Sequence, residues 1–385
     1  MTETPDAFAD RIAARFDIPA ELEPPSRELQ DLLTARHAAL GEPLDPAEVE
    51  RISSGLGLVT LVERIYAELL GYCPPALQQF CRDHVRVRGV RSIAIEGAVY
   101  SSGSGSYAVI VTTSLMILLS KIKKFVFAEN HLDQVVYFNR RPAQELTAEL
   151  ARAIVYEIAA NFRAGEARGP IVMLDERGSQ VVHGMLDFQE GFIVGHELGH
   201  LLADHLLRSM LANGLHSSFG SPSHRSEYLA DIIGYQLARR RDFDHDGPEP
   251  SLETRMGIEI ARISSVCEFF EILELAVPGA TETHPAPSDR IANVLATVYG
   301  EHFGAHYNAV RRQEIATFDW APQFAIGVKP SFMGRLVHAM LTNERQIATM
   351  LRELAERGPT VLADIAARGA AKGNDPRPPD RPSPD

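Results

Sequence analysis

Two histidines with a glutamate beside the first are the residues of this chain best suited to metal chemistry. His196 and His200 are four residues apart, so on a helix both imidazoles lie on one face, one turn apart. Zinc accepts neutral imidazole nitrogen, and a catalytic zinc keeps three protein ligands and one position for water. Glu197 can reach that zinc-bound water and take its proton. The pattern HELGH at 196–200 therefore predicts a hydrolytic zinc site.

Glu227 and Asp231 are the candidates for completing this site. They are also four apart, and the interval after His200 is long enough for one helix to end and the next to return alongside. Glu227 can supply the third zinc ligand, and Asp231 can accept the free ring N–H of a ligand histidine. Ala230 and Gly234 are small, which permits close approach of the two helices.

Plainer interpretations of these residues stay open. The histidine pair could be hydrogen-bonded within a helical core, and Glu227 and Asp231 could form a solvated acidic face. The histidine helix carries much apolar surface, so unpaired polar groups on it would be costly unless an ion or partner satisfies them. Its apolar residues are Phe192, Ile193, Leu198, Leu201, Leu202 and Leu206.

The helices that must carry these residues follow from apolar spacing and from stop signals. A long helix is expected from about Leu186 to Asn213-Gly214, and a second from Ser223 to Arg240. Helical spacing of apolar residues resumes after Pro250 and continues with breaks to about Ala367. Towards the N-terminus, Arg27–Leu40 and Pro46–Leu70 show helical spacing as well.

Strands are expected in the middle of the chain. Ser92–Ile95 and Tyr107–Thr112 are rich in strand-forming residues and flank a Gly/Ser loop. Pro170–Leu174 and Gln180–Val182 form a candidate hairpin, and Leu146–Phe162 has a helical period. The predicted fold class is helix-rich α+β.

The expected domain organisation follows from these predicted helices and strands. We expect an N-terminal helical region at 1–90, a zinc-binding core at 91–300, a C-terminal helical region at 301–367 and a disordered tail at 368–385. The tail is rich in Pro, Asp and Arg and has almost nothing apolar, which cannot form a core.

Composition limits the partners and the compartment. The 385 residues carry a formal charge of -13, which argues against nucleic acid as the main partner. The basic run at Lys121, Lys123 and Lys124 is interpreted as a solvated face. The three cysteines offer no CxxC pair and no disulfide framework, which fits a reducing compartment.

The longest apolar stretch is too short for a membrane span. Tyr107–Leu119 falls well below the about 20 residues that a helix needs to cross a bilayer. It is expected to be a buried strand that runs into a helix. The first ten residues are acidic and do not read as a secretory signal, so we expect a cytoplasmic protein without a transmembrane segment.

These motifs resemble the HtpX and CAAX prenyl endopeptidase family of zinc metallopeptidases, within the gluzincins. HELGH at 196–200 followed by ExxAD at 227–231 carries the resemblance, and Thr283-His284-Pro285 followed by Arg290-Ile291 is similar to the family's downstream segment. Tyr107–Leu115 resembles the family's substrate-edge strand and the turn after it. The resemblance covers Arg91 to Val298.

The resemblance implies a gluzincin-like core and a role for each site residue. His196, His200 and Glu227 would be the zinc ligands, Glu197 the general base and Asp231 a supporting group. His284 would lie by the metal, where it occludes the ion or stabilises an oxyanion, unless it is merely structural. Arg290 would pair with a carboxylate near the site.

Two features depart from this family. Most relatives have membrane spans beside the site and none is visible in this sequence, which argues against prenylated or membrane-embedded substrates. The family also places its edge strand shortly before the HExxH helix, whereas residues 113–190 intervene here. Either an insertion occupies 121–182, or the edge strand is Ile171–Leu174 or Val181–Gly184. An edge strand would bind an extended substrate by strand addition.

A calcium loop is a second candidate metal site. Asp242–Gly247 and Glu253 satisfy the EF-hand pattern. Pro248 and Pro250 occupy the exit of the loop, and no second hand accompanies it, so an acidic turn is favoured.

The predicted function is a zinc-dependent metalloendopeptidase acting on a protein or peptide bound as an extended strand. The main alternative is a regulatory or interaction protein that retains a structural or latent zinc site. A zinc hydrolase acting on a non-peptide amide is a third possibility.

Overall fold

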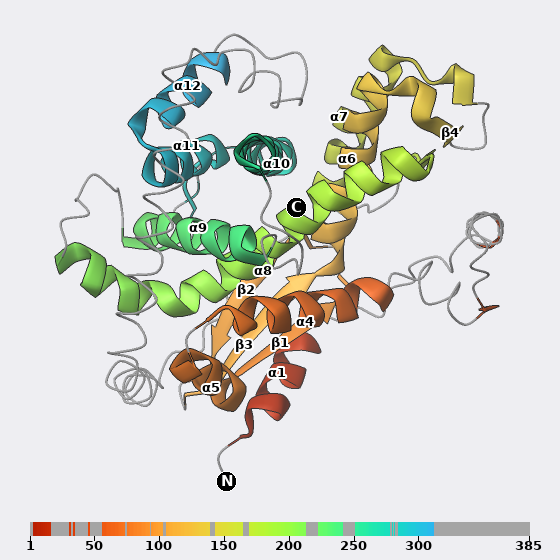
Figure 1. The fold of residues 1–385 in the computed structure, drawn as a ribbon. Coiled ribbons are helices and arrows are strands. Elements are labelled where there is room, and N and C mark those ends of the chain that lie inside the picture. The colour runs from red at the N-terminus through yellow and green to blue at the C-terminus, as the bar shows by residue number, and fades with distance from the viewer. Residues whose placement is uncertain are drawn as a thin grey trace.

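Helices dominate the structure (Figure 1), and the described residues form one three-stranded and one two-stranded sheet. The computed structural model describes residues 3–16, 31, 34, 45–46, 56–73, 75–92, 94–102, 105–138, 143–164, 169–212, 222–241, 251–277, 279, 281 and 284–311. The helix-rich α+β prediction is confirmed. The predicted helix Arg27–Leu40 lies outside these residues apart from positions 31 and 34, as do the calcium loop up to Pro250 and everything after Arg311.

The larger sheet holds β1 (Val85–Val90), β2 (Gly97–Ser101) and β3 (Tyr107–Thr112) in the order β1-β3-β2. β1 runs parallel to the central β3, and β2 runs antiparallel to it. The predicted strand Tyr107–Thr112 is confirmed, but the prediction of a strand at Ser92–Ile95 is wrong. That segment leads the chain around the end of β3, from β1 on one side to β2 on the other.

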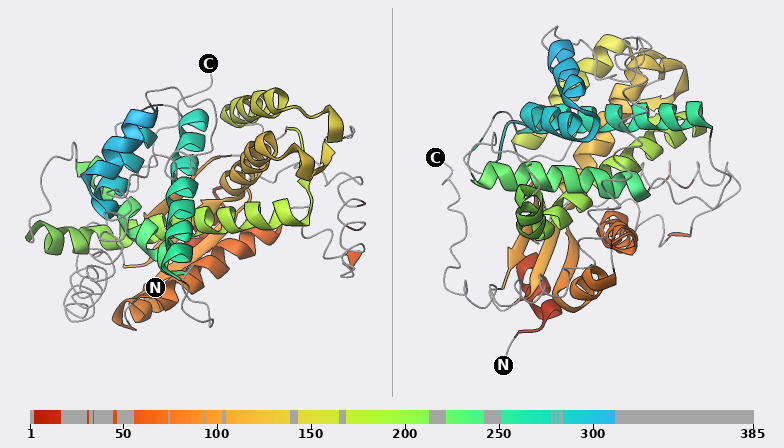
Figure 2. Two further views of the ribbon diagram at one scale, coloured as in Figure 1. Left: turned by 45° about the horizontal axis from the view of Figure 1, so that its top comes forward. Right: turned by 60° about the vertical axis from the view of Figure 1, so that its left-hand side comes forward.

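The two faces of this sheet are covered by different helices. Helix α1 (Pro5–Ala13) packs Phe8 and Ile12 on one face, where Arg86 and Arg88 of β1 pair with acidic residues of α1. The other face joins the main core, to which α4 (Leu56–Gly71), α5 (Pro75–His84) and α8 (Glu176–Ala212) contribute (Figures 1 and 2). Alternate strand residues point to opposite faces, so one short sheet serves two cores.

The long helix α8 begins ten residues earlier than its apolar period indicated. Asp175 starts it, since its carboxylate accepts from the backbone N–H of Gly178 at 2.7 Å. The predicted hairpin is therefore wrong, because Gln180–Val182 lies inside α8. Its other half is a strand, β5 (Val172–Leu174), which pairs instead with β4 (Val135–Phe138).

A lobe of two helices and the small sheet separates β3 from α8. Helix α6 (Thr113–Asn130) follows β3 directly, as expected of a strand running into a helix, and α7 (Ala148–Arg163) packs against it. Short 3-10 turns at Leu132–Gln134 and Ala143–Glu145 flank β4. Helix α6 begins before 121–182, the range suggested for an insertion, and the rest of the lobe falls within that range; the insertion stays a prediction.

The basic run on α6 is not a solvated face. Lys123 is 3% exposed and forms a buried ion pair with Glu268 of α10 (Leu252–Ala276), and Lys121 and Lys124 are partly buried. The helical period alone could not show this, because the partner of Lys123 lies on a helix far along the chain.

The remaining helices close the core above α8. Helix α9 (Pro222–Arg241) lies along α8, and α11 (Pro287–Tyr299) and α12 (Glu301–Arg311) pack beyond it (Figure 2). Tyr235 and Tyr299 share a hydrogen bond of 2.6 Å, and Tyr299 donates to the buried Glu259, which links α9, α10 and α11. In the described part, no helix combines the length and hydropathy of a membrane span.

Candidate metal centre

Backbone contact between α8 and α9 sets the geometry of the site. A Cβ added at Gly199 would lie 2.8 Å from the Cα of Ala230, and one at Gly234 would lie 2.6 Å from the backbone nitrogen of His196. Only glycine fits at such separations, so the two helices approach more closely than ordinary side chains allow. The small residues noted in the sequence therefore have the expected consequence.

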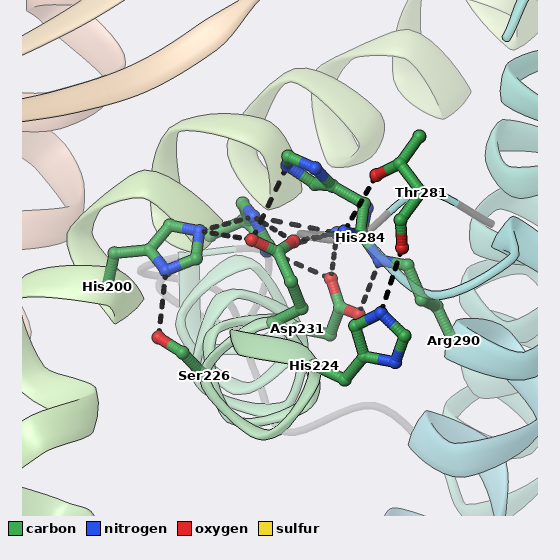
Figure 3. Close-up of polar contacts among 9 residues, drawn as sticks. His200, His224, Ser226, Asp231, Thr281, His284 and Arg290 are labelled. Atoms are coloured by element: carbon green, nitrogen blue, oxygen red, sulfur yellow. Dashed lines mark hydrogen bonds and ion pairs between the residues drawn. The ribbon is translucent and has the colours of Figure 1, made fainter. Parts of the chain in front are cut away.

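Three side chains from these helices converge on one point. The Nε2 atoms of His196 and His200 are 3.0 Å apart. Glu227 completes the triangle, with Oε1 3.3 Å from His200 Nε2 and Oε2 3.6 Å from His196 Nε2. Figure 3 shows His200 together with the polar groups around this point. These three residues could hold a metal ion.

The donor set fits the metal that the sequence motif implies. With bonds of about 2.0–2.1 Å at tetrahedral angles, the ligand atoms of a zinc ion are separated by roughly 3.3 Å. The three separations found here, from 3.0 to 3.6 Å, lie around that value. In addition, Glu227 Oε2 is buried and accepts no hydrogen bond from any described residue, and its ion pair with Arg290 Nη2 is long, at 3.4 Å. A metal ion would add to the compensation of that buried charge.

Asp231 and Arg290 fix the first histidine from behind. Asp231 is fully buried, and its Oδ1 lies 2.9 Å from His196 Nδ1. Arg290 of α11 donates to both carboxylate oxygens of Asp231, at 2.7 and 2.9 Å. His196 therefore donates its Nδ1–H to Asp231 and turns Nε2 towards the metal position.

The second histidine has a weaker support. Ser226 Oγ lies 3.4 Å from His200 Nδ1 (Figure 3). Sequence reasoning missed this serine, because its position directly before Glu227 gives no sign that it reaches back to α8.

Burial and neighbouring charges shift the pKa values of these groups. Burial lowers the pKa of His200 to about 3, aided by His196, so this ring is neutral at physiological pH. Burial also lowers the pKa of His196, but the hydrogen bond and charge of Asp231 outweigh it and raise the net value. Burial opposes ionisation of Asp231, and Arg290 overcomes it, so the pKa of this carboxyl lies well below its usual range.

Glu197 is poised beside the centre and borders a cleft. Its side chain is 5% exposed, and its Oε2 atom is buried and has no hydrogen-bond partner among the described residues. Burial raises its pKa to about 7 and Glu227 adds to the rise, whereas His196 opposes it. A carboxylate of that pKa can exchange a proton near neutral pH.

Strand β2 lies directly against this glutamate. A Cβ added at Gly97 would be 2.5 Å from Glu197 Oε1. Among the described strands, β2 is one of the two edge strands of its sheet, whereas Tyr107–Thr112 is central. Ile171–Leu174 contributes to the other sheet, and Val181–Gly184 lies inside α8. The edge strand beside the site is thus one that the sequence did not indicate.

The cleft has a volume of about 790 Å³ and lies between β2, α8, α10 and the segment before α11. His284 stands at its mouth, with a side chain that is 55% exposed and Nε2 3.5 Å from Glu227 Oε1. Thr281 holds it, since its hydroxyl accepts from the backbone N–H of His284 at 2.9 Å. His224 in turn lies 3.1 Å from the carbonyl oxygen of Thr281 (Figure 3).

The structure thus brings every predicted site residue into one cluster. These residues are His196, Glu197, His200, Glu227, Asp231, His284 and Arg290. Their catalytic and binding roles stay predictions, because convergence by itself shows no reaction. No protein-family model, curated protein or solved structure matches this chain.

Proposed function

We propose that this chain is a zinc-dependent metalloendopeptidase that hydrolyses peptide bonds of a protein or peptide bound as an extended strand. One observation carries the proposal. The three ligand groups meet at separations suited to zinc, and the buried Glu197 lies between them and the edge strand β2. The resemblance of HELGH, ExxAD and THP to the HtpX and CAAX prenyl endopeptidase family supports the same reaction.

His196, His200 and Glu227 would hold the ion. When bound, zinc supplies Lewis-acid polarisation of a water molecule and of the substrate carbonyl. Asp231 keeps the Nε2 lone pair of His196 directed at the centre, and Ser226 does the same for His200.

Glu197 performs the proton transfers. Its carboxylate takes a proton from the attacking water and delivers it to the amide nitrogen as the peptide bond breaks. Its burial suits this task, because a carboxylate shielded from bulk water binds the proton firmly enough to carry it between the two groups. Glu197 is not one of the three residues grouped as ligands, so its carboxylate can act on water rather than on the ion.

The open edge of β2 favours a peptide over a small amide as substrate. No described strand pairs with the outer edge of β2, and an extended peptide could add to the sheet along that edge. An extended peptide there would carry its backbone past Glu197. A non-peptide amide would leave most of this edge unused.

His284 acts on the substrate oxygen in this proposal. Its exposed imidazole at the mouth of the cleft is close enough to the centre to donate a hydrogen bond to a developing oxyanion. The same closeness, 3.5 Å from Glu227 Oε1, favours one alternative: a latent or structural zinc site in a regulatory protein, with His284 as a fourth ligand.

Zinc content and the Glu197→Gln variant test the proposal together. The purified full-length chain should contain one zinc, and Glu197→Gln should retain that zinc while cleavage of a peptide library falls by about 10²-fold or more. Glu63→Gln on α4, an exposed glutamate, is the matched control and should cleave like the parent.

Two outcomes contradict the proposal. Equal cleavage by Glu197→Gln and the parent would show that the predicted mechanism is wrong. If the parent contains zinc but cleaves nothing, and His284→Ala cleaves nothing either, a peptidase kept latent by His284 is excluded. That result supports the alternative of a regulatory protein with a structural zinc site.

A further inference from the structure

One side of the cleft is an apolar wall. It is formed by Leu115 at the start of α6, Phe192 of α8, Phe269 and Leu273 in the last turns of α10, and Val277 directly after α10. Phe192 and Phe269 pack edge to face with ring centroids 5.3 Å apart, and each is at most 4% exposed. Val277 is 48% exposed and stands at the rim. The two phenylalanines therefore form the buried part of the apolar wall, and Val277 forms its accessible part.

Strand β2 directs alternate residues towards this side. Gly97 faces Glu197, and Val99 lines the cleft and packs against the main core. Tyr100, which follows Val99, packs with the α1 cluster on the opposite face. A residue of an added strand shares the face of the residue directly opposite. A peptide residue opposite Gly97 would thus face Glu197, and one opposite Val99 would face the same cleft, one side of which is the apolar wall.

The polar groups of the cleft are gathered elsewhere. Ser226, Thr281 and His284 line the side formed by α9 and the segment before α11, and Arg290 is engaged by Asp231. No charged side chain belongs to the apolar wall among the described residues that line the cleft. A polar side chain placed there would lose its hydration without gaining a partner, whereas an apolar one gains by burial.

We infer that the apolar wall is a subsite for a bulky apolar side chain of the substrate, such as Leu, Met or Phe, and that Leu273 and Val277 determine its specificity. The inference rests on the proposed function and adds a substrate class to it. The substrate residue that occupies the subsite lies two positions along the peptide from the substrate residue that faces Glu197. Burying such a side chain corresponds to a preference of roughly 10- to 100-fold over a small polar residue at that position.

A peptide series with one position varied tests the subsite on the zinc-loaded full-length chain. For the parent, kcat/KM should be at least about tenfold higher with Leu or Phe than with Ser or Asp at one position. Val277→Asp should remove most of that preference. Leu273→Phe should reduce the space and shift the preference towards smaller apolar residues. Val136→Asp, at a 58% exposed valine on β4, is the matched control and should keep the parent's preference.

The outcomes separate this inference from the proposed function. Cleavage without an apolar preference, or an unchanged preference in Val277→Asp, overturns the subsite while the peptidase stands. If the parent cleaves no peptide, the subsite can be tested by binding alone. Fluorescence anisotropy then measures the affinity of labelled Leu- and Ser-containing peptides for zinc-loaded Glu197→Gln. Tighter binding of the Leu peptide that is lost with Val277→Asp then supports the subsite, and equal binding overturns it. Thermal melting confirms that each variant is folded.

Discussion

Replacing Gly97 by alanine is the sharpest test of how the edge strand and Glu197 work together. The new Cβ would lie 2.5 Å from Glu197 Oε1 and 3.1 Å from its carboxyl carbon. Because the obstructing atom is the far end of a flexible side chain, the carboxylate can swing away and the two backbones can stay in place. The substitution therefore displaces one functional group and leaves its surroundings intact.

The size of the effect follows from that distance. A carbon and an oxygen in ordinary contact are about 3.4 Å apart, so the carboxylate must move by roughly 1 Å. A misplacement of about 1 Å in a catalytic group can lower the rate by about 10²-fold, equivalent to about 2.7 kcal/mol in the barrier. The φ angle of Gly97 is not in the left-handed region, so alanine fits the backbone and should stabilise the strand by up to roughly 1 kcal/mol.

Three measurements on Gly97→Ala check this reasoning: zinc content, thermal unfolding and kcat. We expect a full zinc complement, an unchanged or higher melting temperature and a kcat reduced by about 10²-fold. Gly184→Ala is the control, since Gly184 lies in α8 with no atom within 4 Å of an added Cβ, and it should keep full activity. Full activity of Gly97→Ala would refute either the contact of β2 with Glu197 or the role of that glutamate as the base.

Three further predictions concern packing, metal affinity and pH. Gly234→Ala forces a Cβ to within 2.6 Å of the backbone nitrogen of His196, where neither atom can swing aside, so it should lower the free energy of unfolding by about 1–3 kcal/mol in urea titrations. Asp231→Asn removes the carboxylate that orients His196, and zinc affinity measured against a competing chelator should fall by about 10- to 100-fold, while an unchanged affinity would argue against a supporting role. Burial, reinforced by Asp187, raises the pKa of Glu190 from 4.5 to about 7. Between these pH values the folded chain binds a proton that the unfolded chain releases, so stability falls as pH rises through this window. Glu190→Gln should remove the part of this decline that Glu190 contributes and stabilise the chain at pH 8 by up to about 3 kcal/mol, as urea melts at pH 5 and pH 8 would show.

The ligand set could be predicted from sequence because most of its geometry is local. Two histidines four apart must share a helical face, and the same holds for Glu227 and Asp231. The second helix was expected at Ser223–Arg240 and is found at Pro222–Arg241, since apolar spacing and stop signals act within a few residues. Only one non-local step remained, the contact of the two helices, and the small residues Ala230 and Gly234 on the second helix indicated it.

The strands were harder because their partners decide them. Ser92–Ile95 and Gln180–Val182 have strand-like composition, yet one connects two strands and the other continues a helix begun by Asp175. Val172–Leu174 was correctly expected to be a strand, but its partner is β4 rather than the following segment. Composition measures how well a segment fits a pleated surface, and it does not choose between several available surfaces.

For the same reason, the substrate specificity could not be predicted from the HELGH and ExxAD motifs. β1 and β2 have similar strand character, and both pair with β3, so either could have been the strand beside Glu197. The choice depends on residues 91–96, which carry the chain around the end of β3, and on a glycine at position 97 that lets the strand touch the carboxylate. The apolar wall then needs the last turns of α10 to pass over α8 at Phe192. The ligands of a metal centre can thus be predicted from short sequence spacings. The surface that selects a substrate forms only when elements distant in the chain come together, so no local sequence pattern identifies its residues.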